Sequence, residues 1–310
     1  MNHSPLVSVL IPTYNYAQYL DEAIQSVLSQ TYKNFELIIV DNRSTDNTDE
    51  VVKKYLADQR ISYYKNDRNL GLVGNWNKCV SYAKGEYVKF LMSDDKFKEE
   101  LLEEFVDVMK RYPNVAIVTS NSEIFGARSK IRISEFIGLQ NGKDIVYKCL
   151  KQGTGNLIGE PTTVMFRKKD LDRVGEFKTD YTCLVDLNMW LRLLDCGDIY
   201  FMARTLSFFR VHNNQQSSRA NVSNWIDEYH FYKDVQKYNT YQLEVNSIGS
   251  LGLESVIKDR ALHCANGMYS ILPRFFKGNN PSVISKAFII CTRERLVGRS
   301  FVSLIKKQLH

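Results

Sequence analysis

Residues 85–95 read GEYVKFLMSDD, an apolar run that ends in two adjacent carboxylates. Apolar and less apolar residues alternate along the run, which predicts a β-strand. In an open α/β sheet the ligand crevice lies outside the carboxyl ends of the strands, so this strand would bring Asp94 and Asp95 to that crevice. Two carboxylates there would suit a Mg²⁺ or Mn²⁺ ion shared with substrate phosphates. The alternative is that one of them caps the helix predicted for residues 98–112.

Strand-like and helix-like segments alternate through the first half of the chain. Short apolar runs predict strands at residues 7–11, 35–40, 61–64 and 85–92. Between them, apolar residues at helical spacing predict helices at residues 19–29, at 49–56 and around Trp76 to Val80. This alternation is typical of a mostly parallel sheet with helices on both faces, as in Rossmann-like α/β folds.

The second half of the chain is less regular. Further strands are predicted at residues 115–120, 160–166 and 200–211, and the run VDLNMWLRLL predicts a helix that begins near Asp186. From Asn224 onward the pattern is helical. We therefore expect an α/β domain over residues 1–218 and a helical C-terminal extension over residues 219–310.

Composition is that of an ordinary globular protein, with 310 residues and 44% hydrophobic residues. The six cysteines have neither close pairing nor histidine partners at zinc-ligand spacing, which indicates reduced thiols and a cytosolic protein. No secretory signal opens the sequence, and no apolar stretch is long enough to span a bilayer.

The net charge of +6 is concentrated near the C-terminus, where residues 271–310 hold eight Lys or Arg and one acidic residue. We predict that residues 295–309 form an amphipathic helix, with Val297 and Phe301 in its apolar stripe, that lies on the cytoplasmic membrane leaflet. The alternative is that the stripe packs against the protein. Nucleic acid is not an expected partner, because the tail lacks a recognition motif.

Six motifs in order carry a resemblance to a known family. They are VSVLIPTYNYAQYLDEAIQSVLSQTY, FELIIVDNRSTDNT, NLGLVGNWNKCVSYAKGEYVKFLMSDD, GEPTTVMFRKKDLDRVGEF, VDLNMWLRLL and FFRVHNNQQS. Their order over residues 6–218 resembles the family 2 glycosyltransferases of the GT-A fold. The resemblance implies transfer of a sugar, most simply a hexose from a UDP-sugar, to an acceptor hydroxyl with inversion, aided by Mn²⁺ or Mg²⁺. The acceptor would be a growing cell-surface glycan or a lipid-linked oligosaccharide, reached from the inner face of the membrane.

The resemblance also implies where the nucleotide binds. The expected contacts are Pro12, Thr13, Tyr14, Asn15, Asp41, Ser44, Asn69 and Asn77. Asp41 would accept a hydrogen bond from the base or the ribose, and the Tyr14 ring would lie near the base. The alternatives are that Asp41 is a turn residue and that Tyr14 belongs to an ordinary strand-to-helix loop.

The metal motif departs from the family pattern. The usual D-x-D triplet stands here as Met92-Ser93-Asp94, so the first Asp is missing. The resemblance makes Asp94 the direct metal ligand and Asp95 an ancillary one, with weaker metal affinity as a possible result. Ser93 would lie beside the donor.

Three residues of the second half complete the expected site. His212 would contact the metal or the diphosphate, and Arg210 would pair with phosphate oxygens. Asp186 matches the family's catalytic base, which removes the acceptor proton during inverting transfer. Without the resemblance, Asp186 reads as a helix N-cap and His212 as a structural histidine.

Two other functions compete with this interpretation. A nucleotide-sugar-binding scaffold with a decayed active site would explain the missing Asp, although Asp94, Asp95, Asp186 and His212 together favour an enzyme. An NAD-dependent oxidoreductase is disfavoured because no G-x-G-x-x-G follows the first strand. The sequence specifies neither the sugar, the base, the acceptor, the oligomeric state nor the role of residues 219–310.

Overall fold

The computed structural model describes residues 4–152, 156–181, 183–212, 222–238, 252–271 and 281–294. The chain forms two compact units. The first comprises Met1–Val146, Asn156–Thr179 and Val185–His212, and the second comprises Tyr147–Gly155, Asp180–Leu184 and Asn213–His310. The expected domain boundary at residue 218 lies outside the described residues.

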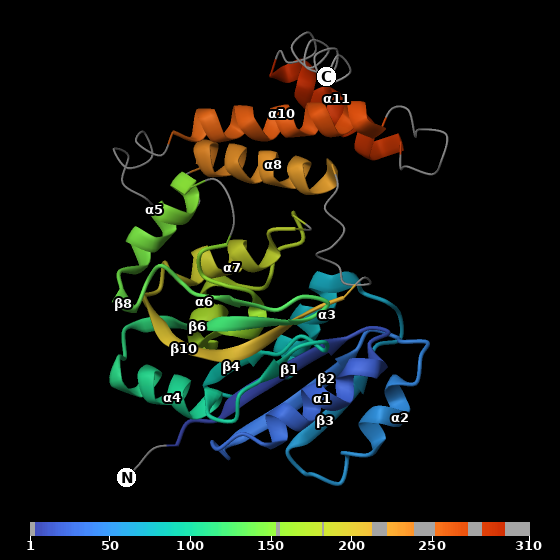
Figure 1. Cartoon of the computed structure of the whole chain (residues 1–310), viewed down its shortest axis with the longest axis vertical. Helices are drawn as coiled ribbons and strands as arrows, with labels where there is room; N and C mark the ends of the chain where they lie inside the picture. The colour runs from blue at the N-terminus through green and yellow to red at the C-terminus, as the bar shows by residue number, and fades with distance from the viewer. Residues whose placement is uncertain are drawn as a thin grey trace. The chain divides into compact units, whose positions relative to one another are not determined.

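The first unit is built on one mixed sheet of ten strands with the order β3-β2-β1-β4-β9-β6-β10-β5, in which β7 pairs with β6 and β8 with β10 (Figure 1). The strands are β1 (Val7–Thr13), β2 (Phe35–Asp41), β3 (Ile61–Lys65), β4 (Tyr87–Phe90), β5 (Lys96–Phe97), β6 (Val115–Gly126), β7 (Lys130–Arg132), β8 (Gly138–Gln140), β9 (Val164–Arg167) and β10 (Asp198–Val211). Strands β3, β2, β1 and β4 are parallel, and β9 runs antiparallel to both β4 and β6. The predicted α/β fold with a parallel N-terminal half is therefore confirmed.

Helices connect and cover these strands. They are α1 (Ala17–Leu28), α2 (Thr48–Lys53), α3 (Gly71–Tyr82), α4 (Leu101–Arg111), α5 (Gly142–Gln152), the 3₁₀ turn η1 (Pro161–Thr163), α6 (Lys168–Val174) and α7 (Val185–Leu193). The end of α5 belongs to the second unit.

Successive side chains of a strand point to opposite faces of the sheet, so the buried strands have a core on each side. On one face, Leu20 of α1 and Phe105 of α4 pack in a cluster with Val9 of β1. On the other face, the Trp76 ring of α3 lies 5.6 Å from the Phe90 ring of β4. The strand ends that carry polar residues are thus held between two rigid layers.

The second unit contains the predicted helical extension, with α8 (Val222–Tyr238), α10 (Leu253–Ile271) and α11 (Pro281–Arg293). Helix α10 contacts both α8 and α11, and the Tyr229 hydroxyl donates to the Glu294 carboxylate at 2.5 Å. None of the helices in the described part of the chain is long and apolar enough to cross a membrane. The amphipathic helix predicted for residues 295–309 lies outside the described residues.

Candidate active site

Polar loops follow the carboxyl ends of β1, β2 and β4, which are parallel neighbours. Thr13, the last residue of β1, is in register with Asp41, the last residue of β2. The loops after these strands and the Asp94-Asp95 turn therefore lie along one edge of the sheet, where α/β folds bind ligands. Every residue of the predicted site belongs to the first unit.

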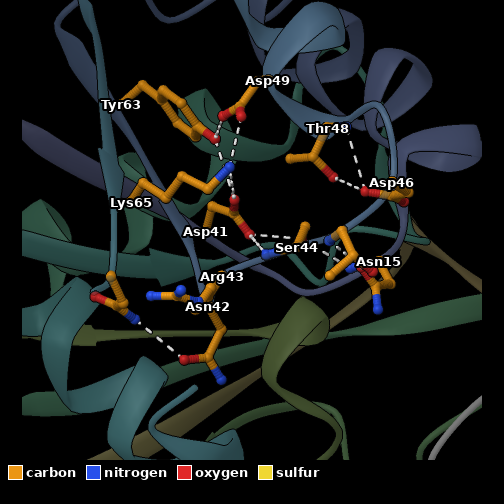
Figure 2. A network of polar contacts seen from close by, with 12 residues as sticks. Asn15, Asp41, Asn42, Arg43, Ser44, Asp46, Thr48, Asp49, Tyr63 and Lys65 are labelled. Atoms are coloured by element: carbon orange, nitrogen blue, oxygen red, sulfur yellow. Dashed lines mark hydrogen bonds and ion pairs between the residues drawn. The ribbon is translucent and has the colours of Figure 1, made fainter. Parts of the chain in front are cut away.

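The loop after β1 is tied to the loop after β2 by side-chain hydrogen bonds (Figure 2). Asn15 adopts a left-handed backbone conformation with φ of 57°, which Asn tolerates better than most residues. Its backbone N–H donates to the Ser44 hydroxyl at 2.9 Å, and its side-chain oxygen accepts from the Thr45 N–H at 2.8 Å. The Ala17 N–H, at the start of α1, donates to Asp46 at 3.0 Å. These bonds join residues 15–17 to residues 44–46, and we call the two joined loops, with Asp41 beneath them, the shelf.

Asp41 lies at the centre of the shelf and is fully buried. One carboxylate oxygen accepts from both the N–H and the hydroxyl of Ser44, at 2.8 and 2.5 Å. The other accepts from the Tyr63 hydroxyl at 3.2 Å and lies 3.5 Å from the Lys65 ammonium (Figure 2). In this arrangement Asp41 fixes the loop after β2 through Ser44, and its contact with a nucleotide stays a prediction.

The edge of the shelf contains a residue that the sequence reading missed, Asn42. Its side chain donates to Asn69 at 2.9 Å and accepts from the Leu70 N–H at 2.8 Å, so it joins the shelf to the loop before α3. Asn69 also accepts from the Gly71 N–H at 2.8 Å. The available signal was its place directly after Asp41 in a loop rich in short polar residues.

The Asn77 side chain binds the backbone of the loop after α6. Its side-chain amide donates to the Phe177 carbonyl and accepts from the Phe177 N–H, both at 2.9 Å. A two-way bond of this kind fixes the loop after α6 to α3 and uses both ends of the amide. The donor contact expected for Asn77 stays a prediction.

The end of β1 differs, because its polar atoms are less engaged. Thr13 is 2% exposed, and its hydroxyl is one of the few buried polar atoms of the described residues that lack a hydrogen-bond partner. Pro12 precedes it inside the strand, and the Tyr14 ring is 42% exposed. A buried hydroxyl without a partner is costly.

Asp94 and His212 come together from the ends of two strands that are far apart in the sequence. The His212 Nε2 and the Asp94 Oδ2 lie 3.0 Å apart. The His212 ring packs against the rings of Tyr16 and Tyr19, at centroid distances of 5.5 and 4.8 Å. Burial raises the pKa of Asp94, while the bond to His212 opposes that change.

Arg210 holds this turn in place. Its N–H donates to Asp95 at 2.9 Å, its Nε donates to the Asp94 carbonyl at 2.8 Å, and its guanidinium pairs with Glu22 of α1. The guanidinium also lies over the Phe125 ring at 4.2 Å. Arg210 thus supports the Asp94-Asp95 turn, and the phosphate contact expected from the sequence stays a prediction.

Asp95 is buried, and both of its carboxylate oxygens are used. One accepts from the Arg210 N–H and the other from the Thr162 hydroxyl at 2.5 Å. Burial, and then the neighbouring Asp94 charge, raise the pKa of Asp95 well above its usual range. These protein contacts hold the Asp95 carboxylate in place, and the ancillary metal contact expected for it stays a prediction. The intervening Ser93 is also buried.

Lys89 lies beneath this turn and is completely buried in β4. Its ammonium donates to the carbonyl of Thr162 and lies 3.3 Å from the Phe90 carbonyl and 3.5 Å from that of Pro161. The Phe97 ring faces it at 4.6 Å. Burial lowers the pKa of Lys89, whereas carbonyl oxygens and an aromatic face stabilise an ammonium. Lys89 fixes the backbone from which Thr162 reaches Asp95.

Asp186 stands in the first turn of α7 and is half-buried. Its carboxylate accepts from the Leu187 N–H at 2.8 Å and from the Asn156 amide at 3.0 Å. Burial raises the pKa of Asp186 to about 6; the Glu160 charge also raises it, and the hydrogen bonds oppose the change. A carboxyl group with this pKa is ionised at neutral pH and still basic enough to accept a proton.

Residues 156–162 connect the two acidic parts of the site. At one end of this segment Asn156 donates to Asp186, and at the other Thr162 donates to Asp95. Between them Glu160 pairs with Arg132. The candidate base and the Asp94-Asp95 turn are therefore positioned by the same short segment.

The residues present fit a divalent cation bound in part by the protein. A carboxylate oxygen and an imidazole nitrogen 3.0 Å apart have the spacing of two neighbouring ligands about 2.1 Å from one ion. Imidazole suits Mn²⁺ better than Mg²⁺, which takes oxygen ligands. No group of three or more His, Cys, Asp and Glu is arranged to hold a metal in the described ranges. Oxygens of a bound diphosphate would complete the coordination, as is common for such ions.

Comparison with known proteins yields relatives that are named glycosyltransferases. The sequence is 32% identical over 243 residues to TuaG of Bacillus subtilis strain 168, a glycosyltransferase provisionally named for teichuronic acid biosynthesis, covering 75% of this chain and 92% of TuaG. It is also 32% identical over 194 residues to the Escherichia coli UDP-Glc:alpha-D-GlcNAc-diphosphoundecaprenol beta-1,3-glucosyltransferase WfgD, covering 63% of this chain and 72% of WfgD.

Solved structures of glycosyltransferases share the fold. S. aureus TarS in complex with UDP-GlcNAc matches with a TM-score of 0.68 at 20% identity, over 83% of this chain and 72% of that one. The mannosyltransferase PcManGT of Pyrobaculum calidifontis, in complex with GDP-Man and Mn²⁺, matches with a TM-score of 0.60 at 16% identity, over 98% and 87%. The sequence profile described as glycosyl transferase family 2 matches residues 8–175. With its fold, its relatives and this match in agreement, the chain belongs to glycosyltransferase family 2.

Proposed function

We propose that this protein transfers a hexose, with inversion, from a UDP-sugar to a hydroxyl group of a cell-surface glycan or a lipid-linked oligosaccharide. The observation that carries the proposal is Asp186, a half-buried carboxylate with a pKa raised to about 6 that shares a positioning segment with the Asp94-Asp95 turn. Inverting transfer needs one base that removes the acceptor proton as the hydroxyl attacks.

The roles of the chain's own residues follow from their contacts. Asp186 accepts the proton of the acceptor hydroxyl, and Asn156 orients the carboxylate for this step. The shelf of Asn15, Asp41 and Ser44 supports the nucleotide, with Asp41 acting from inside the shelf. Tyr14, which is 42% exposed directly after β1, would lie beside the base.

Asp94 and His212 would hold the divalent cation, Mn²⁺ in preference to Mg²⁺. The bound ion would supply Lewis-acid stabilisation of the negative charge on the leaving diphosphate. Arg210 and Asp95 keep the Asp94 carboxylate at the end of β10 and thereby beside His212. Loss of the first Asp of the D-x-D triplet leaves this pair intact.

The substrate class rests on the relatives. TuaG is named for teichuronic acid biosynthesis, and WfgD is named for a UDP-Glc donor and a diphosphoundecaprenol-linked acceptor. TarS was solved with UDP-GlcNAc. These names favour a UDP-sugar and an acceptor of the cell envelope, which would be met at the cytoplasmic face of the membrane.

The test is a panel of UDP-Glc, UDP-GlcNAc and GDP-Man, each with and without Mn²⁺, scored by thermal stabilisation and by slow donor hydrolysis. We expect a UDP-sugar to stabilise the protein and to be hydrolysed when Mn²⁺ is present. A β-linked product from an α-linked donor, identified by NMR, would establish inversion. Donor binding with no turnover on any acceptor fraction would favour the nucleotide-sugar-binding scaffold instead.

A further inference from the structure

The segment between β6 and β10 crosses the face of the sheet. Strand β7 pairs with β6 on the same side of β6 as β9 does. Strand β8 pairs with β10 on the side of β10 that faces away from β6. The chain between them must therefore pass over both β6 and β10, a path whose ends can be followed in Figure 1. We call residues 131–139 of this crossing the strap.

The inward side of the strap is fastened to the sheet. The Ser134 N–H donates to the side-chain oxygen of Asn121 at 2.8 Å, and the Phe136 ring lies 5.2 Å from the Phe201 ring. Asn121 itself donates to the Ala203 carbonyl at 2.9 Å. The strap is thus held in one register, with its even-numbered residues toward the protein.

The outward side of the strap is apolar, the reverse of what an exposed strand normally shows. Its odd-numbered residues alternate with the fastened ones and point to solvent. The exposed fractions are 55% for Ile131, 73% for Ile133, 65% for Ile137 and 47% for Leu139. Four large aliphatic side chains on one short segment form the kind of patch that marks an interaction site.

Cations stand beside this patch. Arg128 and Lys130 are both exposed, and among the described residues neither forms an ion pair. Glu135 is the one acidic residue of the strap and is also exposed. Arg132 is already committed, because it pairs with Glu160 and lies over the Phe209 ring at 4.9 Å. Cations that adjoin the isoleucines in the sequence, on long flexible side chains, complement an interface of acyl chains and anionic head groups.

We propose that the strap docks on the surface of an anionic lipid bilayer, with its isoleucines at the acyl boundary and Arg128 and Lys130 against the phosphate groups. This inference rests on the proposed function, for which a lipid-linked acceptor must be met at a membrane. The connection to the site is short: Arg132 lies within the strap and pairs with Glu160, which stands between Asn156 and Thr162 on the segment that positions the base. A docked strap therefore places the candidate base close to the lipid surface.

The test is co-sedimentation of the full-length protein with vesicles of phosphatidylglycerol and phosphatidylethanolamine, and with vesicles of phosphatidylcholine alone. We expect Ile133→Ser/Ile137→Ser to lower the partition constant at least about fivefold on both vesicle types, because apolar burial is lost. Arg128→Gln/Lys130→Gln should lower it on the order of tenfold on the anionic vesicles at low salt, and little on the neutral ones.

A matched control replaces two exposed apolar side chains outside the strap. Phe288 and Ile289 of α11 are 52% and 61% exposed, and Phe288→Ser/Ile289→Ser should leave sedimentation unchanged. The proposal is overturned if this control lowers binding while the strap variants do not, or if the wild type stays in solution with anionic vesicles. It is also overturned if the strap variants instead convert a dimer into a monomer in lipid-free solution.

Donor hydrolysis separates this proposal from the proposed function. The strap variants should hydrolyse UDP-sugar at the wild-type rate, because none of their substituted residues lies in the site. Vesicle binding without any hydrolysis by the wild type would remove the transferase proposal and leave the docking surface standing. Hydrolysis without vesicle binding would do the opposite.

Discussion

The pH dependence of transfer should move in opposite directions when the two neighbours of Asp186 are changed. Ionised Asp186 is the active form, so a higher pKa means that activity is lost at a higher pH. Asn156 donates to the carboxylate and stabilises its charge, whereas Glu160 opposes it. Asn156→Asp should therefore shift the acid limb of the kcat/KM profile to higher pH, and Glu160→Gln should shift it to lower pH.

The magnitude follows from the hydrogen bond. A bond to a charged group contributes roughly 1.5 to 3 kcal/mol when buried, and about 1.4 kcal/mol is reasonable for a half-buried carboxylate. That free energy corresponds to about one pKa unit. The limb of Asn156→Asp should therefore move from about 6 in the wild type upward by about one unit or more. At pH 6 its kcat/KM should then be about fivefold lower than that of the wild type, with little difference at pH 8.5.

Asn156→Asp keeps the oxygen that accepts from the Ile158 and Gly159 N–H groups, at 3.0 and 3.1 Å. It removes the amide nitrogen that donates to Asp186 and, at 2.8 Å, to the Gly159 carbonyl. The assay is initial-rate kinetics from pH 5 to pH 9 with a saturating UDP-sugar and a varied acceptor. If neither variant moves the acid limb, the limb does not report Asp186, and its role as the base must be abandoned.

Three further changes test the remaining parts of the site. Asp186→Asn should reduce turnover by about 10²- to 10⁴-fold, the usual contribution of a general base, with unchanged donor affinity by calorimetry; weaker donor binding in a folded variant would make it a binding residue. Asp94→Ala should weaken Mn²⁺-dependent donor binding about tenfold or more, and full activity of the wild type in EDTA would remove its metal role. Lys89→Met leaves the carbonyls of Pro161 and Thr162 without their donor and should lower the free energy of unfolding, measured by chemical denaturation, by about 2 kcal/mol. Equal or greater stability would show that the Lys89 contacts do not stabilise the protein.

Most of the fold follows from patterns that a sequence displays. The helix expected at residues 98–112 is α4, and the strand expected at residues 35–40 is β2 with one more residue. Such elements are set by local periodicity and by the capping and turn residues at their ends. The path of β7 and β8 was not predicted, because their pairing with β6 and β10 depends on contacts distant in sequence and their outward residues are apolar.

The candidate site was predictable in position and less so in detail. The sequence correctly brought Asp94 and His212 to the same edge of the sheet, where they meet at 3.0 Å. For Asp95, Arg210 and Asn77 the sequence predicts direct contacts with metal or donor; the structure gives each of them a protein partner, and the ligand contacts stay predictions. A family motif preserves the residues that build a site together with those that touch a ligand, and a motif alone does not separate the two.

Lys89 is a residue whose environment the sequence pattern does not predict. Within the alternating run of β4 it occupies a less apolar position, which by itself suggests solvent. Both faces of β4 are covered, because Phe90 packs against Trp76 of α3 on one face and the Phe97 and Phe105 rings lie over Lys89 on the other. Alternation there distinguishes two cores rather than core from water. The ammonium is consequently caged by the Phe90, Pro161 and Thr162 carbonyls. A buried cation near the buried Asp95 carboxylate is costly unless each group is bonded, and here each is. The Asp94-Asp95 turn is therefore fixed by protein contacts alone, which is what the proposed base and diphosphate site would need in order to act on the same sugar.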